Sequence, residues 1–119
     1  MVVSAERAGN YAVFFDPLDG SSNIDINAPL GSIFSIHRLS VSSSVVGSSD
    51  YLKPGLEQIA GGYILYGAST ILVYTCGEGV HLFTLSPDNG DFLLTMSNIT
   101  IPARGKIYSV NEGNYQKWS

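Results

Sequence analysis

Apolar residues along this chain fall mostly in short runs whose length suits β-strands. Residues 11–15 read Tyr-Ala-Val-Phe-Phe, a continuous run closed by Asp16-Pro17, which is typical of a strand buried on both faces. Residues 30–38 alternate in a β-like manner. The stretch 40–50 is rich in serine and valine and predicts a surface connection.

One segment in the middle of the chain shows helical spacing instead. We expect a helix over residues 56–66, because the apolar positions recur as on one helix face: Leu56, Ile59, Ala60, Tyr63 and Ile64. The pair Gly61-Gly62 counts against a helix. In a helix, these glycines would allow close packing onto a sheet.

The remaining pattern predicts a run of consecutive strands. We expect strands at 71–75, 80–85, 91–95 and 106–110, with hairpin turns at 77–79 and 87–90. The strands after Ile71 leave no room for crossover helices, which excludes a doubly wound parallel sheet. The predicted fold class is therefore α+β, a mostly antiparallel sheet backed by helix.

The composition suggests that part of the surface is normally covered. The chain has 119 residues, about one domain's worth, and 45% of them are hydrophobic, as in globular proteins. Only 13% are charged, whereas a soluble domain usually has roughly 25%. So few charges cannot cover the whole surface, and we expect the rest of a longer chain, or a neighbouring subunit, to cover some of it.

Charge and cysteine content narrow the partners and the compartment. The net charge is −4 and the six Lys and Arg are scattered, so we expect neither nucleic acid nor a membrane as a partner. The single cysteine, Cys76, rules out an internal disulfide and fits a reducing compartment. No stretch is long and apolar enough to span a bilayer, and the N-terminus lacks a secretory pattern, so we expect a soluble, cytoplasmic protein.

The segment 16–23 carries the candidate chemistry. Asp16 and Asp19 follow the first predicted strand, with Pro17 restricting the backbone and Gly20 permitting a tight bend. Mg²⁺ prefers such carboxylates, and the Leu18 carbonyl offers a third oxygen between them.

The next residues favour an anion. Gly20-Ser21-Ser22 offers successive N–H groups and two hydroxyls, and a helix starting near Asn23 would point those N–H groups at a phosphate. A metal site beside a phosphate site is what metal-assisted phosphoryl transfer requires. Taken alone, Asp-x-x-Asp-Gly is also compatible with an ordinary acidic turn that caps a helix.

The full string Asp-Pro-Leu-Asp-Gly-Ser-Ser-Asn-Ile-Asp, residues 16–25, resembles the signature of class I fructose-1,6-bisphosphatases, in the lithium-sensitive, magnesium-dependent phosphatase superfamily. Sedoheptulose-bisphosphatases typically carry Ile-Val-Asp after the serines, where this chain has Asn23-Ile24-Asp25. Segments 31–36, 61–67, 72–75 and 106–115 are also similar to bacterial or plastid members.

The resemblance implies the layered sugar-phosphatase fold and a set of roles. Residues 1–105 would belong to the N-terminal metal- and phosphate-binding domain, and 106–119 would begin the C-terminal sugar-phosphate domain. It implies that Asp16, the Leu18 carbonyl and Asp19 bind metal. It also implies substrate-binding residues: Asp19, Gly20, Ser21 and Ser22 for the 1-phosphate, Asn111 for the 6-phosphate, and Tyr115, which is offset by one position from the tyrosine of some relatives.

The implied activity is Mg²⁺-dependent hydrolysis, with Mn²⁺ as a substitute, of the 1-phosphate of fructose 1,6-bisphosphate in gluconeogenesis or the Calvin cycle. The family also implies a homotetramer, and a plastid location in photosynthetic eukaryotes. Its acid–base Ser-Glu-Glu segment and its later Arg, Lys and Glu ligands have no counterpart here. We therefore expect the middle of the enzyme, inactive alone. The alternatives are a sedoheptulose or dual sugar bisphosphatase, and a non-catalytic remnant that binds a full-length subunit.

Overall fold

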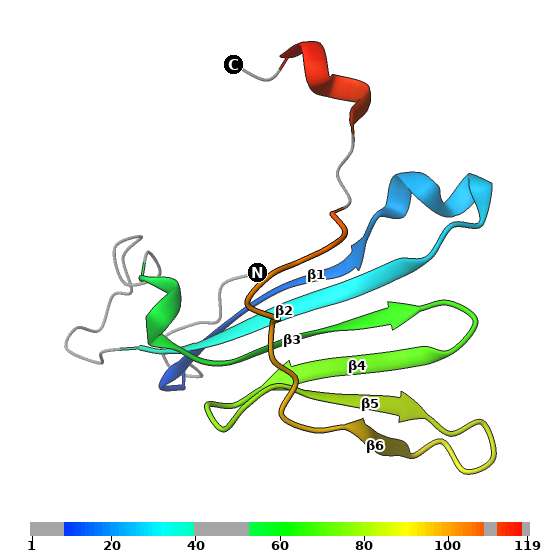
Figure 1. Cartoon of the computed structure of the whole chain (residues 1–119). Coiled ribbons are helices and arrows are strands. Elements are labelled where there is room, and N and C mark those ends of the chain that lie inside the picture. Colours follow the sequence, from blue (N-terminus) through cyan, green and yellow to red (C-terminus); the bar gives the residue numbers. More distant parts are fainter. Residues whose placement is uncertain (1–8, 40–52, 109–111, 118–119) are drawn as a thin grey trace.

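A single antiparallel sheet dominates the computed structural model, which describes residues 9–39, 53–108 and 112–117 (Figure 1). Its strands pair in chain order, each with the next, so the topology is a six-stranded meander. The strands are β1 Tyr11–Asp19, β2 Leu30–Arg38, β3 Gln58–Tyr66, β4 Thr70–Thr75, β5 His81–Leu85 and β6 Phe92–Met96. Short 3₁₀ segments make up the helical part: η2 Ser21–Ile26, η4 Gly55–Glu57 and η5 Glu112–Lys117.

The helix predicted over residues 56–66 is wrong. Only its first two residues are helical, as part of η4, and Gln58–Tyr66 forms the central strand β3, paired on both sides with β2 and β4. The Gly61-Gly62 pair weakens a helix, whereas the aromatic and β-branched residues from Tyr63 to Tyr66 suit a pleated surface. Pairing on both sides decides the outcome, because it satisfies the backbone hydrogen bonds of this segment within the sheet.

The other strand predictions are largely confirmed. The segments expected at 30–38, 71–75, 80–85 and 91–95 are β2, β4, β5 and β6, each within a residue of its predicted ends. The strand expected at 106–110 is wrong for residues 106–108, which belong to no strand, while 109 and 110 lie outside the described residues. The connection predicted at 40–50 also lies outside them.

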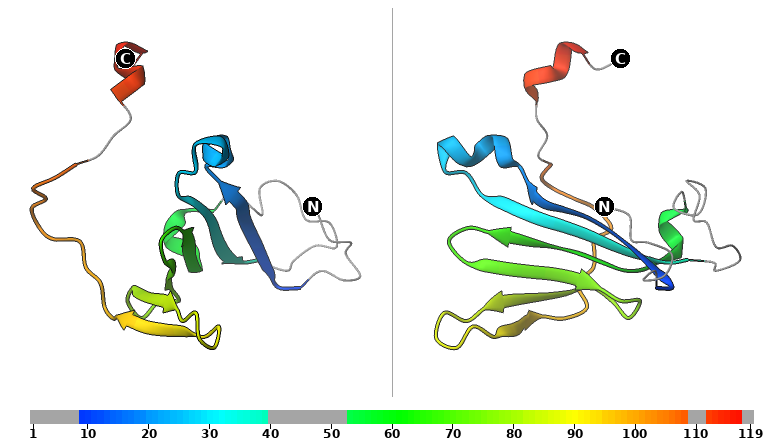
Figure 2. Two further views of the ribbon diagram at one scale, coloured as in Figure 1. Left: turned by 90° about the vertical axis from the view of Figure 1, so that its right-hand side faces the viewer. Right: turned by 180° about the vertical axis from the view of Figure 1, so that it is seen from behind.

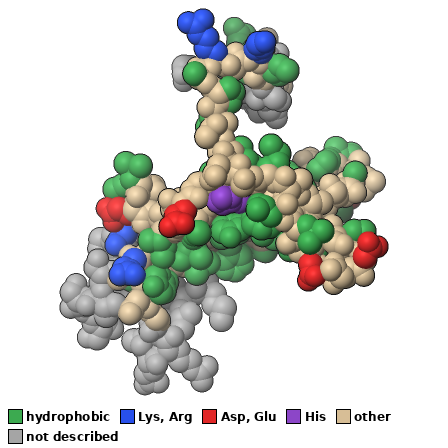
Figure 3. Space-filling view, turned by 60° about the horizontal axis from the view of Figure 1, so that its bottom comes forward, with side chains coloured by type: hydrophobic (Ala, Val, Ile, Leu, Met, Phe, Trp, Pro, Cys, Tyr) green, Lys and Arg blue, Asp and Glu red, His purple; other side chains and the backbone are tan. Residues whose placement is uncertain are grey.

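Both faces of the sheet are apolar. Residues that pair across an antiparallel sheet project to the same side. By the register, one face carries Phe14, Ile33, Tyr63, Val73 and Leu82, and the other carries Phe15, Phe34, Ile64, Leu72 and Phe83. In the space-filling view of Figure 3, hydrophobic side chains spread over the sheet, and charged side chains lie towards its ends and on the segment that projects away from it.

The predicted burial of residues 11–15 on both faces is not observed. Among the described residues only Ala12 and Val73 are buried hydrophobics, and Phe15 is 68% exposed. No described segment forms a second layer over either face, as the two views of Figure 2 show. Residues 100–108 do not pack on the sheet either, since Ile101 is 95% exposed. The absence of a covering layer leaves the apolar runs in solvent.

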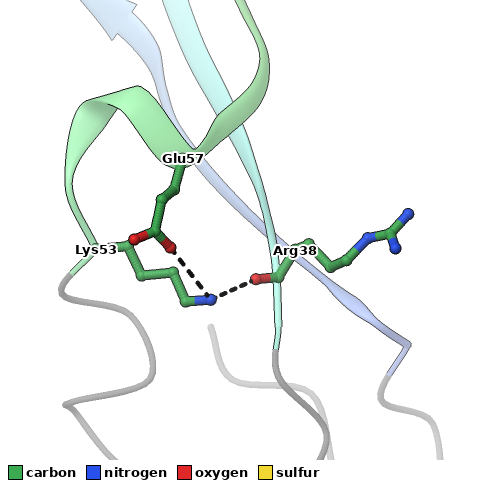
Figure 4. Close-up of polar contacts among 3 residues, drawn as sticks. All are labelled: Arg38, Lys53 and Glu57. Carbon is green, nitrogen blue, oxygen red and sulfur yellow. Dashed lines mark hydrogen bonds and ion pairs between the residues drawn. The ribbon is translucent and has the colours of Figure 1, made fainter.

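One polar contact fastens η4 to the end of β2 (Figure 4). The Lys53 ammonium donates a hydrogen bond of 2.9 Å to the Arg38 carbonyl and lies 3.8 Å from the Glu57 carboxylate. The ion pair contributes little because the Glu57 side chain is 55% exposed, so the hydrogen bond to Arg38 is the stronger contact. Within the described residues, no helix is long and apolar enough to cross a membrane.

Candidate functional site

A β-bulge brings the two candidate metal-binding carboxylates to the same face of the sheet. Asp16 pairs with Ile33 and Asp19 pairs with Gly31, so three residue steps on β1 match two on β2. In a regular strand, residues three apart project to opposite faces. The one extra residue reverses this alternation, so Asp16 and Asp19 both project to the face that carries Phe14 and Ile33.

The strand predicted to stop at Pro17 continues through it. β1 runs from Tyr11 to Asp19 and contains Pro17 within the irregular stretch. Proline is tolerated there because a bulged residue does not need to donate to the ladder. The prediction that the strand ends at Pro17 was therefore wrong. The candidate metal ligands lie at the C-terminal end of β1 and not in a loop.

Short hydrogen bonds hold this bulge. The Leu18 N–H donates to Asp16 Oδ1 at 3.0 Å, which orients the first carboxylate. The Ser32 hydroxyl of β2 donates to the Pro17 carbonyl at 2.7 Å, and the Tyr66 hydroxyl lies 2.9 Å from Ser32 Oγ. These contacts connect β1, β2 and β3 at the same point.

Gly20 turns the chain out of β1. Its φ of 81° lies in the left-handed region, which glycine adopts without a Cβ clash. The helix expected near Asn23 begins at Ser21 as the 3₁₀ segment η2, and the Asn23 N–H donates to the Gly20 carbonyl at 2.8 Å. Ser21 and Ser22 are thus the first residues of η2, separated from Asp19 in sequence only by Gly20.

The oxygen ligands at this site are of the kind that a hard divalent cation prefers, but they are fewer than such a cation needs. Two exposed carboxylates on one face, with the Leu18 carbonyl between them in sequence, are all oxygen ligands, which Mg²⁺ and Mn²⁺ accept and structural Zn²⁺ sites rarely use. The described part of the chain contains no group of three or more His, Cys, Asp or Glu that could hold a metal. Water and a substrate phosphate would have to supply the remaining ligands.

Of the two distant substrate-binding predictions, only Tyr115 lies within the described residues, and it is not brought to this site. Asn111 lies outside the described residues. Tyr115 belongs to η5 and is 70% exposed, and η5 stands apart from the sheet and from η2 in Figures 1 and 2. Their roles therefore stay predictions.

A pocket of about 520 Å³ lies between the end of η2 and the β3–β4 hairpin. Its lining residues are uncharged: Asn27, Ala28, Pro29, Tyr66, Gly67, Ala68 and Thr70. Without a cation or a metal, it offers little to a phosphate.

Sequence reasoning missed Ser32 and Tyr66 near the candidate site, since they lie 15 and 49 residues after Pro17 and carry no local motif.

Comparison with known proteins identifies the family of the chain. Residues 1–97 match the family model described as the N-terminal domain of fructose-1-6-bisphosphatase. The chain is 51% identical over 120 residues to the class 1 fructose-1,6-bisphosphatase of Chlorobium chlorochromatii, covering 100% of this chain and 36% of that protein. It is 58% identical to the enzyme of the same name from Maridesulfovibrio salexigens, covering 93% and 33%.

The fold comparison agrees. A crystal structure of Leishmania major fructose-1,6-bisphosphatase in holo form superimposes with a TM-score of 0.86 at 45% identity, covering 100% of this chain and 38% of that one. The predicted fold class, part of the sugar-phosphatase fold with a mostly antiparallel sheet, is thereby confirmed, whereas no helix backs the sheet within the described residues. The division predicted after residue 105 stays a prediction. The chain spans about one third of the length of the curated relatives it matches, and it belongs to the fructose-1,6-bisphosphatase family.

Proposed function

We propose that this chain supplies the metal-binding and 1-phosphate-binding part of a cytoplasmic enzyme that hydrolyses fructose 1,6-bisphosphate to fructose 6-phosphate and phosphate. The observation that supports this most directly is the bulge that places Asp16 and Asp19 on one face of the sheet. The relatives are named fructose-1,6-bisphosphatases, which supports fructose 1,6-bisphosphate as the substrate. The reaction would serve carbohydrate metabolism, in gluconeogenesis or carbon fixation.

Each residue has a proposed task. Asp16, Asp19 and the Leu18 carbonyl hold Mg²⁺ or Mn²⁺, which supplies Lewis-acid stabilisation of the charge that develops on the transferred phosphoryl group. The hydrogen bond from Leu18 N–H to Asp16 Oδ1 leaves the other oxygen of that carboxylate for the cation. Gly20, Ser21 and Ser22 orient the 1-phosphate through their N–H groups and hydroxyls.

We propose further that the 119 residues alone are inactive or nearly so. Two carboxylates on an exposed strand end hold Mg²⁺ weakly, because no third His, Cys, Asp or Glu joins them in a metal-binding group within the described residues. The acid–base segment that the family resemblance implies also has no counterpart in the sequence. Tyr115, proposed to bind substrate, stands apart from this site, so a further part of the protein would have to bring it there.

A chimera tests this proposal. The chain replaces the matching third of the Chlorobium chlorochromatii relative, and phosphate release is measured with Mg²⁺ on fructose and sedoheptulose bisphosphates. We expect the chimera to hydrolyse fructose 1,6-bisphosphate and Asp16→Asn or Asp19→Asn to reduce the rate by about 100-fold or more. Asp88→Asn, in the exposed β5–β6 turn, is the control and should leave the rate unchanged.

Two results would overturn the proposal. One is a chimera that folds but keeps its rate in the Asp16 and Asp19 variants. The other is metal-dependent phosphate release by a homogeneous preparation of the 119-residue chain, which would contradict its proposed inactivity.

A further inference from the structure

The Pro17 carbonyl lies in the bulge between the two candidate metal ligands, and a side chain from the next strand satisfies it. A bulge removes the local ladder pairing, so a carbonyl there bonds either to water or to a donor outside the ladder. The Ser32 hydroxyl is that donor, at 2.7 Å from the Pro17 oxygen. Ser32 therefore holds the backbone one residue before Leu18, whose carbonyl is a proposed metal ligand.

The direction of the second hydrogen bond follows from the first. A carbonyl oxygen can only accept, so the single proton of the Ser32 hydroxyl points to Pro17. The Tyr66 hydroxyl, 2.9 Å from Ser32 Oγ, must then donate its proton to Ser32. The result is an ordered chain of two hydrogen bonds from Tyr66 to Ser32 to Pro17, and each bond in such a chain polarises the next.

This relay, the two hydrogen bonds from Tyr66 to Ser32 and from Ser32 to Pro17, lies on the face of the sheet opposite the carboxylates. Ser32 pairs with Ile64, and Tyr66 pairs with Leu30, so both side chains project to the face opposite Asp16 and Asp19. The relay therefore cannot touch a metal held by the carboxylates. The relay can affect the metal site only through the Pro17 backbone, because its one contact with β1 is the hydrogen bond to the Pro17 carbonyl.

We propose that Ser32 and Tyr66 are positioning residues for the metal site, which keep the β1 bulge in the conformation that turns both carboxylates to one face. This inference rests on the proposed metal binding by Asp16 and Asp19. The internal bond from Leu18 N–H to Asp16 Oδ1 holds the bulge on the carboxylate side, and the relay holds it on the other. Without these hydrogen bonds, water replaces Ser32 as the donor to the exposed Pro17 carbonyl, and we expect the bulge to shift because it has lost its side-chain tie to β2.

The sequence offers a selective spectroscopic probe of this carbonyl. Only two leucines follow a proline, Leu18 after Pro17 and Leu30 after Pro29. With ¹³C-carbonyl proline and ¹⁵N leucine, a carbonyl-correlated amide spectrum of the 119-residue chain shows those two signals alone. The Pro17–Leu18 signal reports the hydrogen bond from Ser32, and a Pro29→Ala variant assigns the pair.

Four variants distinguish a positioning role of Ser32 and Tyr66 from a general loss of stability of the sheet. Ser32→Ala removes the donor to Pro17, Ser32→Thr keeps the hydroxyl, and Tyr66→Phe removes only the distal hydroxyl. Thr84→Val is the matched control, because it removes a side-chain hydrogen bond of 2.8 Å from Thr95 in the same sheet, at strands β5 and β6. Circular dichroism compares the folding of all four.

Mg²⁺ is titrated into each variant while the Leu18 amide shift is followed. We expect Ser32→Ala to move the Pro17–Leu18 signal and to weaken Mg²⁺ binding by about 10-fold, as loss of an orienting contact commonly does. Tyr66→Phe should weaken it by about threefold, since it removes the more distant bond. Ser32→Thr and Thr84→Val should stay within about twofold of the unaltered chain.

Each outcome decides a separate claim. If Ser32→Ala and Tyr66→Phe fold and bind Mg²⁺ as the unaltered chain does, the positioning role is overturned while the proposed metal site stands. If Mg²⁺ fails to move the Leu18 signal of the unaltered chain, and Asp16→Asn changes nothing, the proposed metal binding by this chain fails, and the positioning role with it. Should Ser32→Ala not fold, Tyr66→Phe and Ser32→Thr decide the question.

Discussion

Gly62 and Tyr74 face each other across β3 and β4 so closely that a Cβ on Gly62 would lie 2.7 Å from the Tyr74 Cβ. The same Cβ would lie 2.5 Å from the Val73 carbonyl oxygen and 3.0 Å from the Phe34 ring. Tyr74 is itself held by stacking on Phe83, with ring centroids 5.5 Å apart. A glycine at position 62 therefore lets aromatic side chains from three strands pack on this face.

Gly62→Ala should destabilise the sheet. Alanine normally gains about 0.5–1 kcal/mol over glycine inside a strand. Here the added methyl meets a backbone oxygen that cannot move alone, so we expect a net loss of about 1–3 kcal/mol in the free energy of unfolding. Urea unfolding followed by circular dichroism measures this. Gly55→Ala is the control, because nothing lies within 4 Å of a Cβ there.

An unchanged midpoint for Gly62→Ala would mean that β3 and β4 separate easily, contrary to the packing described here. Equal losses in Gly62→Ala and Gly55→Ala would show that the loss does not come from the contacts at Gly62, because the Cβ position of Gly55 is open.

Gly20→Ala should damage the candidate site beyond its cost in stability. Gly20 and Gly90 both have left-handed backbones, with φ of 81° and 76°, and neither Cβ position is crowded. Alanine should cost about 1–2 kcal/mol at either position, because its Cβ is disfavoured in that conformation. Only Gly20→Ala should also weaken Mg²⁺ binding, since Gly20 turns the chain directly after Asp19.

Unfolding in urea and Mg²⁺ titration of the Leu18 amide give the two measurements for this pair of variants. If Gly90→Ala weakens Mg²⁺ binding as much as Gly20→Ala does, the turn after Asp19 has no special part in the site.

The isolated chain should bind the hydrophobic dye ANS while folded. Both faces of its sheet are apolar, and among the described residues Val13 and Phe15 are 57% and 68% exposed. Dye fluorescence should rise with the 119-residue chain and fall in the chimera, where further segments are available to cover the sheet. A double variant, Val13→Ser with Phe15→Ser, should reduce the dye signal without loss of strand content.

A folded chain that leaves the dye fluorescence unchanged would contradict this prediction. It would mean that the exposed apolar faces are covered in solution by another copy or segment.

The sequence predicted the strands that have clear ends. Residues 71–75, 80–85 and 91–95 lie between turns rich in glycine, proline and asparagine, and such turns are local chemistry that a sequence records directly. The segment 56–66 misled because its apolar residues fit both a helix and a strand paired on both sides. Pairing with β2 and β4, which are distant in sequence, decided between the two.

For the candidate site too, the sequence determined one part and the tertiary structure decided the other. The sequence by itself determined its chemistry, since the oxygen donors of Asp16 and Asp19 and the flexible backbone of Gly20 are properties of the residues. Only the tertiary structure decided that the carboxylates share a face, because that depends on one extra residue in the pairing of β1 with β2. It also decided that Ser32 and Tyr66 meet the Pro17 carbonyl, because strand register, and not sequence spacing, sets which distant side chains come into contact.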